Sequence, residues 1–181
     1  MDKFTKEEIK AINKTAFNFG LKGINICSNI TRNAFRIKPI VITREIFTST
    51  IKNLLPNIPV SAFDRKYYLA TLADWENIIQ HDFIDTKKYF TDFFDCDNFG
   101  FLFSSRAAYL YHLNSCGAVQ GNILDPKTRE NKFAHIFNII VTADKKCYLL
   151  EPQTDKLIEI EKGKDLIIGN WLYVPKWGFY F

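Results

Sequence analysis

The sequence has little of what metal-binding and cofactor-binding proteins require. Its 181 residues include three histidines and four cysteines, and the cysteines (Cys27, Cys96, Cys116 and Cys147) are too widely spaced for a C-x-x-C knuckle. This spacing argues against a zinc site. A P-loop, a Rossmann glycine pattern and a zinc-protease motif are also absent.

Long apolar runs and a strong net charge are absent as well. No stretch approaches the length of a membrane helix, so we expect no membrane span. Residues 1–4 lack the apolar run that begins a secretory signal, so we expect no signal peptide and free thiols in a reducing compartment. A formal net charge of +4 argues against nucleic-acid binding.

The charge that is present is uneven. Residues 1–62 hold 10 basic and 4 acidic residues, whereas residues 63–181 hold 14 basic and 16 acidic ones. We therefore predict a basic, mostly helical N-terminal arm over 1–62 and a second domain over 63–181. The composition is 47% apolar and includes 17 Phe, which predicts a core built on large rings.

Hydrophobic periodicity places helices before strands. We expect a helix over 4–19 that begins with a Thr5–Glu8 capping box, and further helices over 44–55, from Asp74, from Thr86 to 93, and over 96–113. The expected strands cover 40–42, 66–70, 117–123, 133–141, 146–152, 156–160 and 170–174. Helices followed by an antiparallel meander indicate an α+β fold.

Cys96 stands where a helix is expected to begin. With Asp95 as the N-cap, the Cys96 sulfur lies among free backbone N–H groups. The positive end of the helix dipole favours thiolate over thiol, and the same N–H groups can stabilise an oxyanion. Asp95 and Asp97 flank the thiol and oppose this effect unless they point away from it. A buried, inert cysteine is the alternative interpretation.

A base for this thiol is found in the strand-rich half. If the hairpin loop is Thr142–Asp144, His135 pairs with Glu151 on the next strand. If the loop is Ala143–Lys145, His135 opposes Gln153, and Glu151 lies on the diagonal of the same face. A two-residue loop would instead put His135 and Glu151 on opposite faces of the sheet. Cys96, His135 and Glu151 therefore form a candidate nucleophile, base and orienting residue. Gln120 and Asn98 are candidate oxyanion donors.

Three short motifs resemble a known family. Phe94-Asp95-Cys96-Asp97-Asn98-Phe99, His135-Ile136-Phe137-Asn138 and Glu151-Pro152-Gln153-Thr154 are similar to motifs in the papain-like C-terminal domain of the Marasmius agglutinin family. The resemblance covers roughly residues 64–175. It implies a papain-like cysteine peptidase fold, in which the helix carrying the cysteine packs on an antiparallel sheet.

The resemblance also implies a site and its ligands. The active residues are Cys96, His135 and Glu151 by motif, and a protein or peptide is the substrate. The family allows a calcium ion, for which Asp95 and Asp97 are candidates, but we favour helix capping as the role of both acids. Gly100 stands where the family usually has alanine. The sugar-binding trefoil of the fused lectin is missing, so its lectin activity is not implied.

The sequence therefore leads to one expected function and one alternative. The first is a papain-like cysteine peptidase or amidase that acts by acyl transfer through Cys96, His135 and Glu151; transglutaminase and peptidoglycan amidase chemistry remain open. The alternative is a phage virion or assembly protein that keeps the fold as a scaffold, or a homo-oligomer formed through the N-terminal arm. We expect the chain in the host cytoplasm or in a virion.

Overall fold

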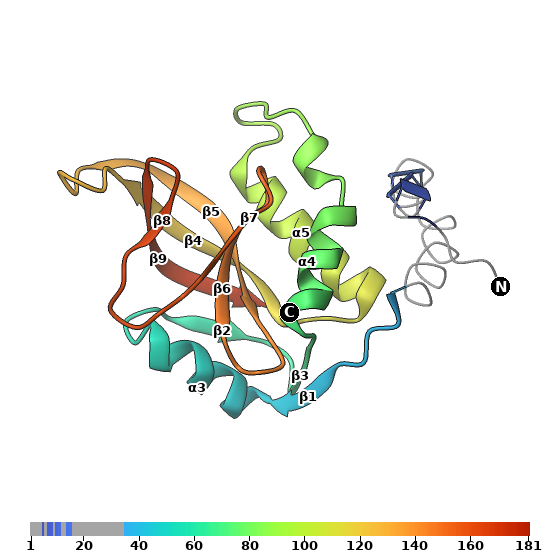
Figure 1. Cartoon of the computed structure of the whole chain (residues 1–181). Coiled ribbons are helices and arrows are strands. Elements are labelled where there is room, and N and C mark those ends of the chain that lie inside the picture. The colour runs from blue at the N-terminus through green and yellow to red at the C-terminus, as the bar shows by residue number, and fades with distance from the viewer. Residues whose placement is uncertain (1–4, 6, 9, 12–13, 16–34) are drawn as a thin grey trace.

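The computed structural model describes residues 5, 7–8, 10–11, 14–15 and 35–181. These residues form a mixed helix-and-sheet fold, consistent with the predicted α+β class (Figure 1). Its helical elements are α3 (Arg44–Leu54), α4 (Leu72–His81), the 3-10 turn η1 (Ile84–Thr86) and α5 (Cys96–Tyr111).

The strands form two sheets. β1 (Ile40–Thr43) and β3 (Lys66–Leu69) make a small antiparallel pair. The larger sheet has the order β2-β9-β4-β5-β6-β7, with β8 also paired to β9. Its strands are β2 (Val60–Ala62), β4 (Cys116–Leu124), β5 (Asn131–Val141), β6 (Cys147–Glu151), β7 (Lys156–Glu159), β8 (Leu166–Ile168) and β9 (Trp171–Tyr180). β2 runs parallel to β9, and the other pairs are antiparallel.

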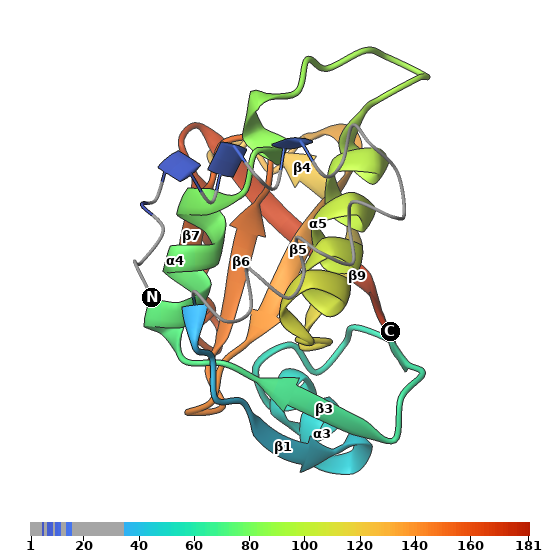
Figure 2. The same cartoon turned by 90° about the vertical axis from the view of Figure 1, so that its right-hand side faces the viewer.

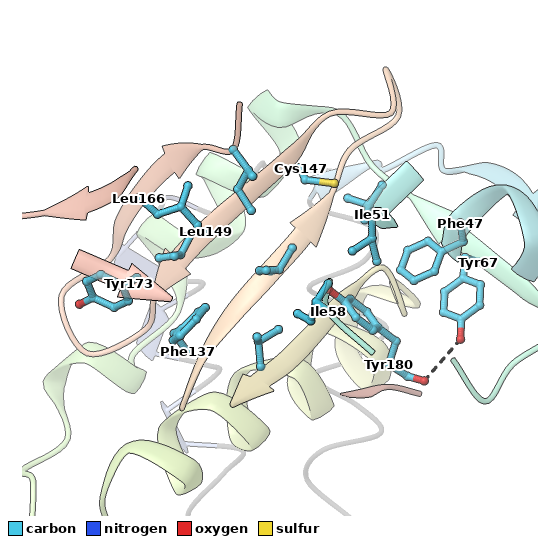
Figure 3. Close-up of a cluster of buried hydrophobic side chains, with 14 of the residues drawn as sticks. Phe47, Ile51, Ile58, Tyr67, Phe137, Cys147, Leu149, Leu166, Tyr173 and Tyr180 are labelled. Carbon is cyan, nitrogen blue, oxygen red and sulfur yellow. Dashed lines mark hydrogen bonds between the residues drawn. The ribbon is translucent and has the colours of Figure 1, made fainter. Parts of the chain in front are cut away.

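The two faces of the sheet pack against different elements. Side chains alternate along a strand, so Ile139 joins the cluster on the α3 face while Ile140 joins the cluster with α4 and α5. Figure 2 shows α4 and α5 over one face of the sheet. On the α3 face, Phe47 stacks on Tyr67 with a centroid separation of 3.9 Å, and the Tyr67 hydroxyl donates to the Tyr180 carbonyl at 3.4 Å (Figure 3).

The apolar stripe predicted for the long helix is confirmed. Phe99, Phe103, Ala107 and Leu110 are all buried, and they pack with Trp75 of α4. Burying one phenylalanine side chain stabilises a fold by about 2 kcal/mol, so this stripe fixes α5 on the sheet. The position of its first residue, Cys96, follows from that packing.

The predicted boundary near residue 62 does not interrupt the packing. Ile42, Phe47 and Ile58 share one cluster with Leu149 and Tyr180. The described part of 1–62 contains β1 and β2 in addition to α3. The Thr5–Glu8 capping box is present, with Thr5 N–H donating to Glu8 Oε2 at 2.7 Å. The predicted end of that helix, at Gly20 and Gly23, lies outside the described residues.

Local chemistry explains where elements differ from expectation. Thr71, not Asp74, is the N-cap of α4, and Asp74 completes its capping box. Thr86 ends the η1 turn instead of opening a helix. Residues 87–95 form turns closed by Phe90 N–H donating to the Phe94 carbonyl at 2.8 Å, and the positive φ of Asp92 (61°) interrupts any helix there.

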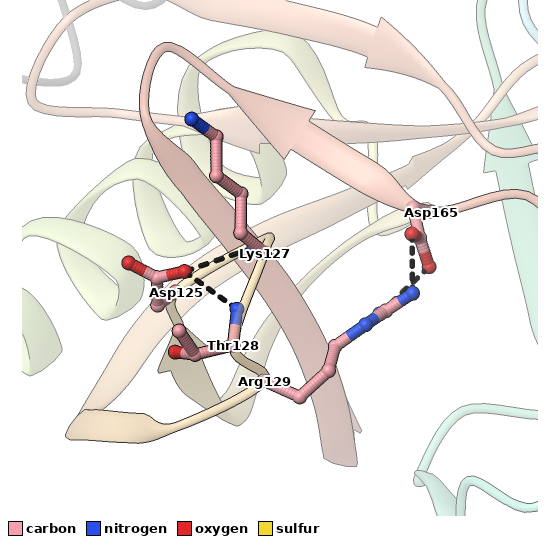
Figure 4. Close-up of polar contacts among 5 residues, drawn as sticks. All are labelled: Asp125, Lys127, Thr128, Arg129 and Asp165. Atoms are coloured by element: carbon pink, nitrogen blue, oxygen red, sulfur yellow. Dashed lines mark hydrogen bonds and ion pairs between the residues drawn. The ribbon is translucent and has the colours of Figure 1, made fainter.

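The β4–β5 hairpin is held by polar contacts at its tip. Asp125 Oδ1 accepts from the backbone N–H groups of Lys127 and Thr128, both at 2.8 Å (Figure 4). Arg129 makes a bidentate ion pair with Asp165, at 3.0 and 2.7 Å, which joins the hairpin to the segment before β8. In the described part of the chain, no helix combines the length and apolar character needed to cross a bilayer.

Candidate functional site: a thiol, an imidazole and a carboxylate in one cleft

Cys96 is the first residue of α5, as the sequence predicts, and Asp95 is its N-cap. The Asp95 backbone N–H donates to Asn98 Oδ1 at 3.1 Å, and the Asn98 N–H donates to Asp97 Oδ1 at 2.9 Å. The Cys96 side chain is half-buried. A sulfur at this position lies at the positive end of the helix dipole and remains accessible from the cleft.

His135 lies on β5 beyond the part that pairs with β6. That pairing runs from Val141↔Cys147 to Asn138↔Leu150. This register is the one predicted for a hairpin loop at Ala143–Lys145. His135 Nε2 lies 2.6 Å from Glu151 Oε2, and the two side chains are 11% and 6% exposed. The imidazole and the carboxylate are therefore paired away from bulk water.

The pKa of His135 reflects both neighbours. Burial lowers it, but hydrogen bonds to Cys96 and Glu151, together with the negative charges of both, raise the pKa of His135 to about 9. Both neighbours therefore favour the protonated form of the imidazole. Its Nε2 faces Glu151, and the ring and Cys96 line the same cleft.

Tyr173 is a member of the site that the sequence reasoning missed. Its hydroxyl donates to Glu151 Oε2 at 3.1 Å, so one carboxylate oxygen binds both Tyr173 and His135. Burial and the charge of Glu151 raise the pKa of Tyr173, which keeps the hydroxyl protonated as a donor. Glu151 Oε1 also accepts from the Gln153 N–H at 3.3 Å. The strand at 170–174 was predicted, but nothing in its pattern distinguishes this tyrosine from a core residue.

These side chains open into a cleft of about 360 Å³. Its aromatic walls are Tyr89, Phe133, Trp171 and Tyr173, and Gln153 and Thr154 add polar groups. Phe133 and Trp171 lie edge to face with centroids 5.7 Å apart. The cleft thus combines exposed rings with a thiol, an imidazole and a carboxylate, as is common for small-molecule sites.

Gly100 allows α5 to approach β5 closely. A Cβ placed on Gly100 would lie 2.8 Å from Ile136 Cγ2 and 3.8 Å from the Phe137 carbonyl oxygen. Ile136 is the neighbour of His135, so this close approach brings the start of α5 to the strand that carries the imidazole. The missing side chain at Gly100 is therefore part of what brings Cys96 and His135 together.

The other described cysteines are in different environments. Cys116 and Cys147 are buried, and burial raises the pKa of each thiol to about 12. Cys27 lies outside the described residues. Cys96 is therefore the described cysteine whose sulfur faces a cleft.

The predicted oxyanion donors do not line the cleft. Gln120 is an exposed β4 residue that pairs with Ile136 and Trp177, and it does not line the cleft. The Asn98 side chain is used in the α5 cap. The structure brings Cys96, His135 and Glu151 into one cleft, which neither Gln120 nor Asn98 lines.

Calcium has little support from the described residues. The Asp95 and Asp97 carboxyl groups hydrogen-bond to each other, which lowers the pKa of Asp95 and raises that of Asp97. No group of three or more His, Cys, Asp or Glu side chains suited to a metal ion occurs in the described part of the chain. The two acids fit helix capping better than metal binding, and we derive no step through calcium.

Comparisons with known proteins find structural relatives only. No family model matches the chain, and no curated protein matches it. Two similar structures are Polyporus squamosus lectin complexes. One is described as PSL1a–E64, with a TM-score of 0.56, and the other as the lectin bound to the human-type influenza-binding epitope Neu5Acα2-6Galβ1-4GlcNAc, with a TM-score of 0.57. Both are 18% identical over 77% of this chain.

The similarity shows the fold, and it corrects the expected function. The match spans about half of each lectin chain, 51% and 49%. Because these neighbours are lectins, the predicted cysteine peptidase or amidase with its peptide substrate is contradicted, and so is the alternative of a phage virion protein. The sequence reasoning inferred substrate and reaction from three short motifs, which specify the local arrangement of side chains but not the ligand.

Proposed function

We propose that Cys96, His135 and Glu151 form a reactive-thiol centre that bonds covalently to an electrophilic ligand held in the cleft. The observation that carries this proposal is the 2.6 Å contact between His135 and Glu151, in a cleft that Cys96 also lines. A protonated imidazole beside sulfur favours the thiolate, which is the nucleophilic form. The proposal concerns the chemistry of the thiol and does not include peptide cleavage.

The bond-forming step uses each of the three residues. The Cys96 sulfur attacks the electrophilic carbon, a C–S bond forms, and the bond from that carbon to its leaving atom breaks. The leaving atom takes the electron pair, and the His135 imidazolium supplies its proton. Glu151 keeps the ring oriented and its positive charge stabilised until that transfer. One similar structure is described as a PSL1a–E64 complex, so E64 is a candidate ligand to test on this thiol.

We also infer a papain-like arrangement of this site, similar to the Marasmius agglutinin type. The inference is supported by the cysteine at the start of α5, the histidine on β5 and the glutamate at the end of β6, in that chain order. It is further supported by the packing of α5 on the antiparallel strands β4 and β5. This inference concerns architecture alone.

Labelling kinetics test the reactive thiol. In a Cys27→Ser background, we expect iodoacetamide and E64 to modify Cys96 at least about tenfold faster than they modify β-mercaptoethanol at neutral pH. Mass spectrometry of the intact and digested protein identifies the labelled residue. Buried Cys116 and Cys147 serve as internal controls and should remain unlabelled in the folded protein.

A variant pair separates imidazole chemistry from fold. His135→Ala should bring the labelling rate of Cys96 down to that of an ordinary thiol, whereas Lys132→Ala, at an exposed position on the same strand, should leave it unchanged. If wild-type Cys96 reacts no faster than β-mercaptoethanol, the proposal is wrong.

A second candidate function is carbohydrate binding in the same cleft. Tyr89, Phe133 and Trp171 line it and are 47%, 46% and 41% exposed, which is unusual for a set of neighbouring rings. Exposed rings offer apolar faces to the C–H surface of a sugar, while Gln153 and Thr154 offer hydrogen bonds. One similar structure is a lectin bound to a sugar epitope.

Sugar titrations test this candidate. Neutral and sialylated N-acetyllactosamine should each be titrated by NMR against the wild type, Trp171→Ala and Trp177→Ala. Trp177 is a matched control, because it is also an exposed β9 tryptophan (45%) but does not line the cleft. Binding that is lost only in Trp171→Ala supports the candidate, and binding unaffected by Trp171→Ala contradicts it.

A further inference from the structure

Asn138 is a fully buried amide between α5 and the sheet. It lies on β5, three residues beyond His135, and is 0% exposed. Its Nδ2 lies within hydrogen-bond distance of three acceptors: the Gly100 carbonyl oxygen at 2.9 Å, Ser104 Oγ at 2.8 Å and the Gly117 carbonyl oxygen at 3.1 Å. One amide on β5 therefore links α5 to the neighbouring strand β4.

Packing alone does not account for this amide. A buried polar atom is unfavourable unless it is hydrogen-bonded, and Asn138 Oδ1 has no hydrogen-bond partner among the described residues. An apolar side chain at this position would avoid that cost. What the amide supplies, and an apolar side chain cannot, is the set of contacts from Nδ2, and all of them go to α5 and β4.

These contacts lie where α5 approaches β5 closely. A Cβ on Gly100 would lie 2.8 Å from Ile136 Cγ2 and 3.9 Å from Asn138 Oδ1. Gly100 is about one helical turn beyond Cys96, and Ile136 is the neighbour of His135. The placement of the thiol relative to the imidazole therefore depends on how α5 sits on β5 at this point.

Asn138 is separate from the cleft itself. Side chains alternate along a strand, so Asn138 and His135, which are three residues apart, point to opposite faces of β5. Asn138 is not one of the residues that line the cleft. Any effect of this amide on Cys96 must therefore pass through the position of α5.

The hydrogen bonds fix what apolar packing leaves free. Burial of its apolar stripe holds α5 against the sheet, but hydrophobic contacts are non-directional. Hydrogen bonds weaken steeply when they are bent, so contacts from one amide to Gly100 and Ser104 restrict both the sliding of α5 along β5 and its rotation about its own axis.

We propose that Asn138 is a positioning residue for the reactive-thiol centre, and that it fixes α5 so that Cys96 stays aligned with the His135–Glu151 pair in the cleft they share. This inference rests on the reactive thiol proposed above. A small shift of α5 is sufficient to matter, because a displacement of about 1 Å can slow a reaction by about 100-fold.

Labelling rates of Asn138 variants test this role. In the Cys27→Ser background, Asn138→Ala removes the amide without adding atoms that could push α5 away. We expect iodoacetamide to modify Cys96 about tenfold more slowly in this variant at neutral pH. The pH profile should change as well, because a misaligned thiol loses the help of the imidazole, and its labelling should follow the pKa of an ordinary thiol, about 8.5.

A milder variant keeps the test valid if Asn138→Ala does not fold. Asn138→Ser retains one hydroxyl donor in a small side chain, and we expect its labelling rate to lie between those of the parent and Asn138→Ala. Circular dichroism and melting curves establish which variants are folded before their rates are compared.

Thr142→Val is the matched control for a loss of stability. Thr142 is also buried, and its Oγ1 donates to the Lys146 carbonyl oxygen at 3.1 Å within the β5–β6 hairpin. It follows the end of β5 that is remote from His135. The substitution removes a buried hydrogen bond, so it should destabilise the protein but leave the labelling rate of Cys96 and its pH profile unchanged.

The outcomes distinguish this inference from the one on which it rests. If the folded Asn138 variants label Cys96 as fast as the parent does, the positioning role is wrong and the reactive thiol stands. If Thr142→Val slows labelling as much as Asn138→Ala does, the slowing reflects lower stability and the positioning role is again wrong. If the parent reacts no faster than β-mercaptoethanol, the reactive-thiol proposal fails, and this inference fails with it.

Discussion

Glu151 Oε2 lies 2.6 Å from His135 Nε2, between two side chains that are almost fully buried. The contact joins the end of β6 to a part of β5 that has no β6 partner. It raises the pKa of the imidazole that shares a cleft with Cys96, and the reactivity proposed for that thiol depends on it.

Replacing Glu151 should lower the pKa of His135. In Glu151→Gln the amide can still accept a hydrogen bond, but the negative charge is gone, so we expect the pKa of His135 to fall from about 9 towards its usual 6.5. A histidine whose pKa is raised by folding stabilises the fold fully below pH 6.5, and this stabilisation is lost as the pH rises through about 9. The loss of thermal stability in Glu151→Gln should therefore be largest below pH 6.5.

NMR titration of the imidazole and melting curves at several pH values measure these two effects. The control is Glu161→Gln, which removes an exposed carboxylate paired with Lys164. An unchanged His135 titration in Glu151→Gln would exclude the ion pair as the cause of the raised pKa.

Removing the Tyr173 hydroxyl should weaken the site without abolishing it. Tyr173→Phe deletes a hydrogen bond to a buried carboxylate, and we expect a loss of about 1–2 kcal/mol in the free energy of unfolding, measured in urea. Tyr148→Phe is the matched control, because that hydroxyl lies at 3.5 Å from Glu159 and contributes less. Equal losses in the two variants would mean that the hydrogen bond from Tyr173 to Glu151 contributes no more to stability than the longer contact of Tyr148.

Adding a side chain at position 100 should separate α5 from β5. The Cβ of Gly100→Ala would meet Ile136 Cγ2 at 2.8 Å, and we expect destabilisation of about 1–3 kcal/mol and slower labelling of Cys96. Ser105→Ala, on the exposed side of the same helix, should be neutral or slightly stabilising. A Gly100→Ala protein with unchanged stability and labelling would contradict the role given to this close approach.

Asp155 should destabilise the protein when it is ionised. Burial, and then the charges of Asp85 and Asp82, raise the pKa of Asp155 to about 7, while Lys10 lowers it. When folding raises the pKa of an acid, ionisation of that acid destabilises the folded protein. For Asp155 this loss of stability develops as the pH rises from 3.8, the usual pKa of aspartic acid, through about 7. After allowance for its partial exposure, Asp155→Asn should therefore stabilise the protein by about 1 kcal/mol above pH 7 and by little near pH 4, as measured by melting curves.

The periodic parts of the chain could be predicted from the sequence because local signals and packing agree there. The stripe Phe99, Phe103, Ala107 and Leu110 is buried as expected, and Asp95 caps α5. The pairing of His135 with Glu151 could also be predicted from the sequence. The turn at 142–146 limits the register of β5 and β6 to a few choices, and the structure has one of them.

The remaining features depend on contacts that are distant in sequence. Tyr173 reaches Glu151 only because β9 lies beside β4 in the sheet order, which no local pattern encodes. The turn at 87–95 is rich in aromatic residues and looked helical, but the Phe90–Phe94 bridge closes it instead. The identity of the ligand is the hardest feature to predict from the sequence, because the cleft walls come from the segment between η1 and α5, from β5 and from β9 together.

The most direct measurement is the ultraviolet absorbance of the thiolate as a function of pH, taken as the difference between Cys27→Ser and Cys27→Ser/Cys96→Ser proteins. Cys116 and Cys147 stay protonated in both because burial raises the pKa of each to about 12. We predict that the absorbance of one thiolate is already present at neutral pH and is absent when His135→Ala is added. If the signal instead appears only near pH 8.5, where ordinary thiols ionise, the paired thiolate and imidazolium do not exist and the reactive-thiol account is contradicted.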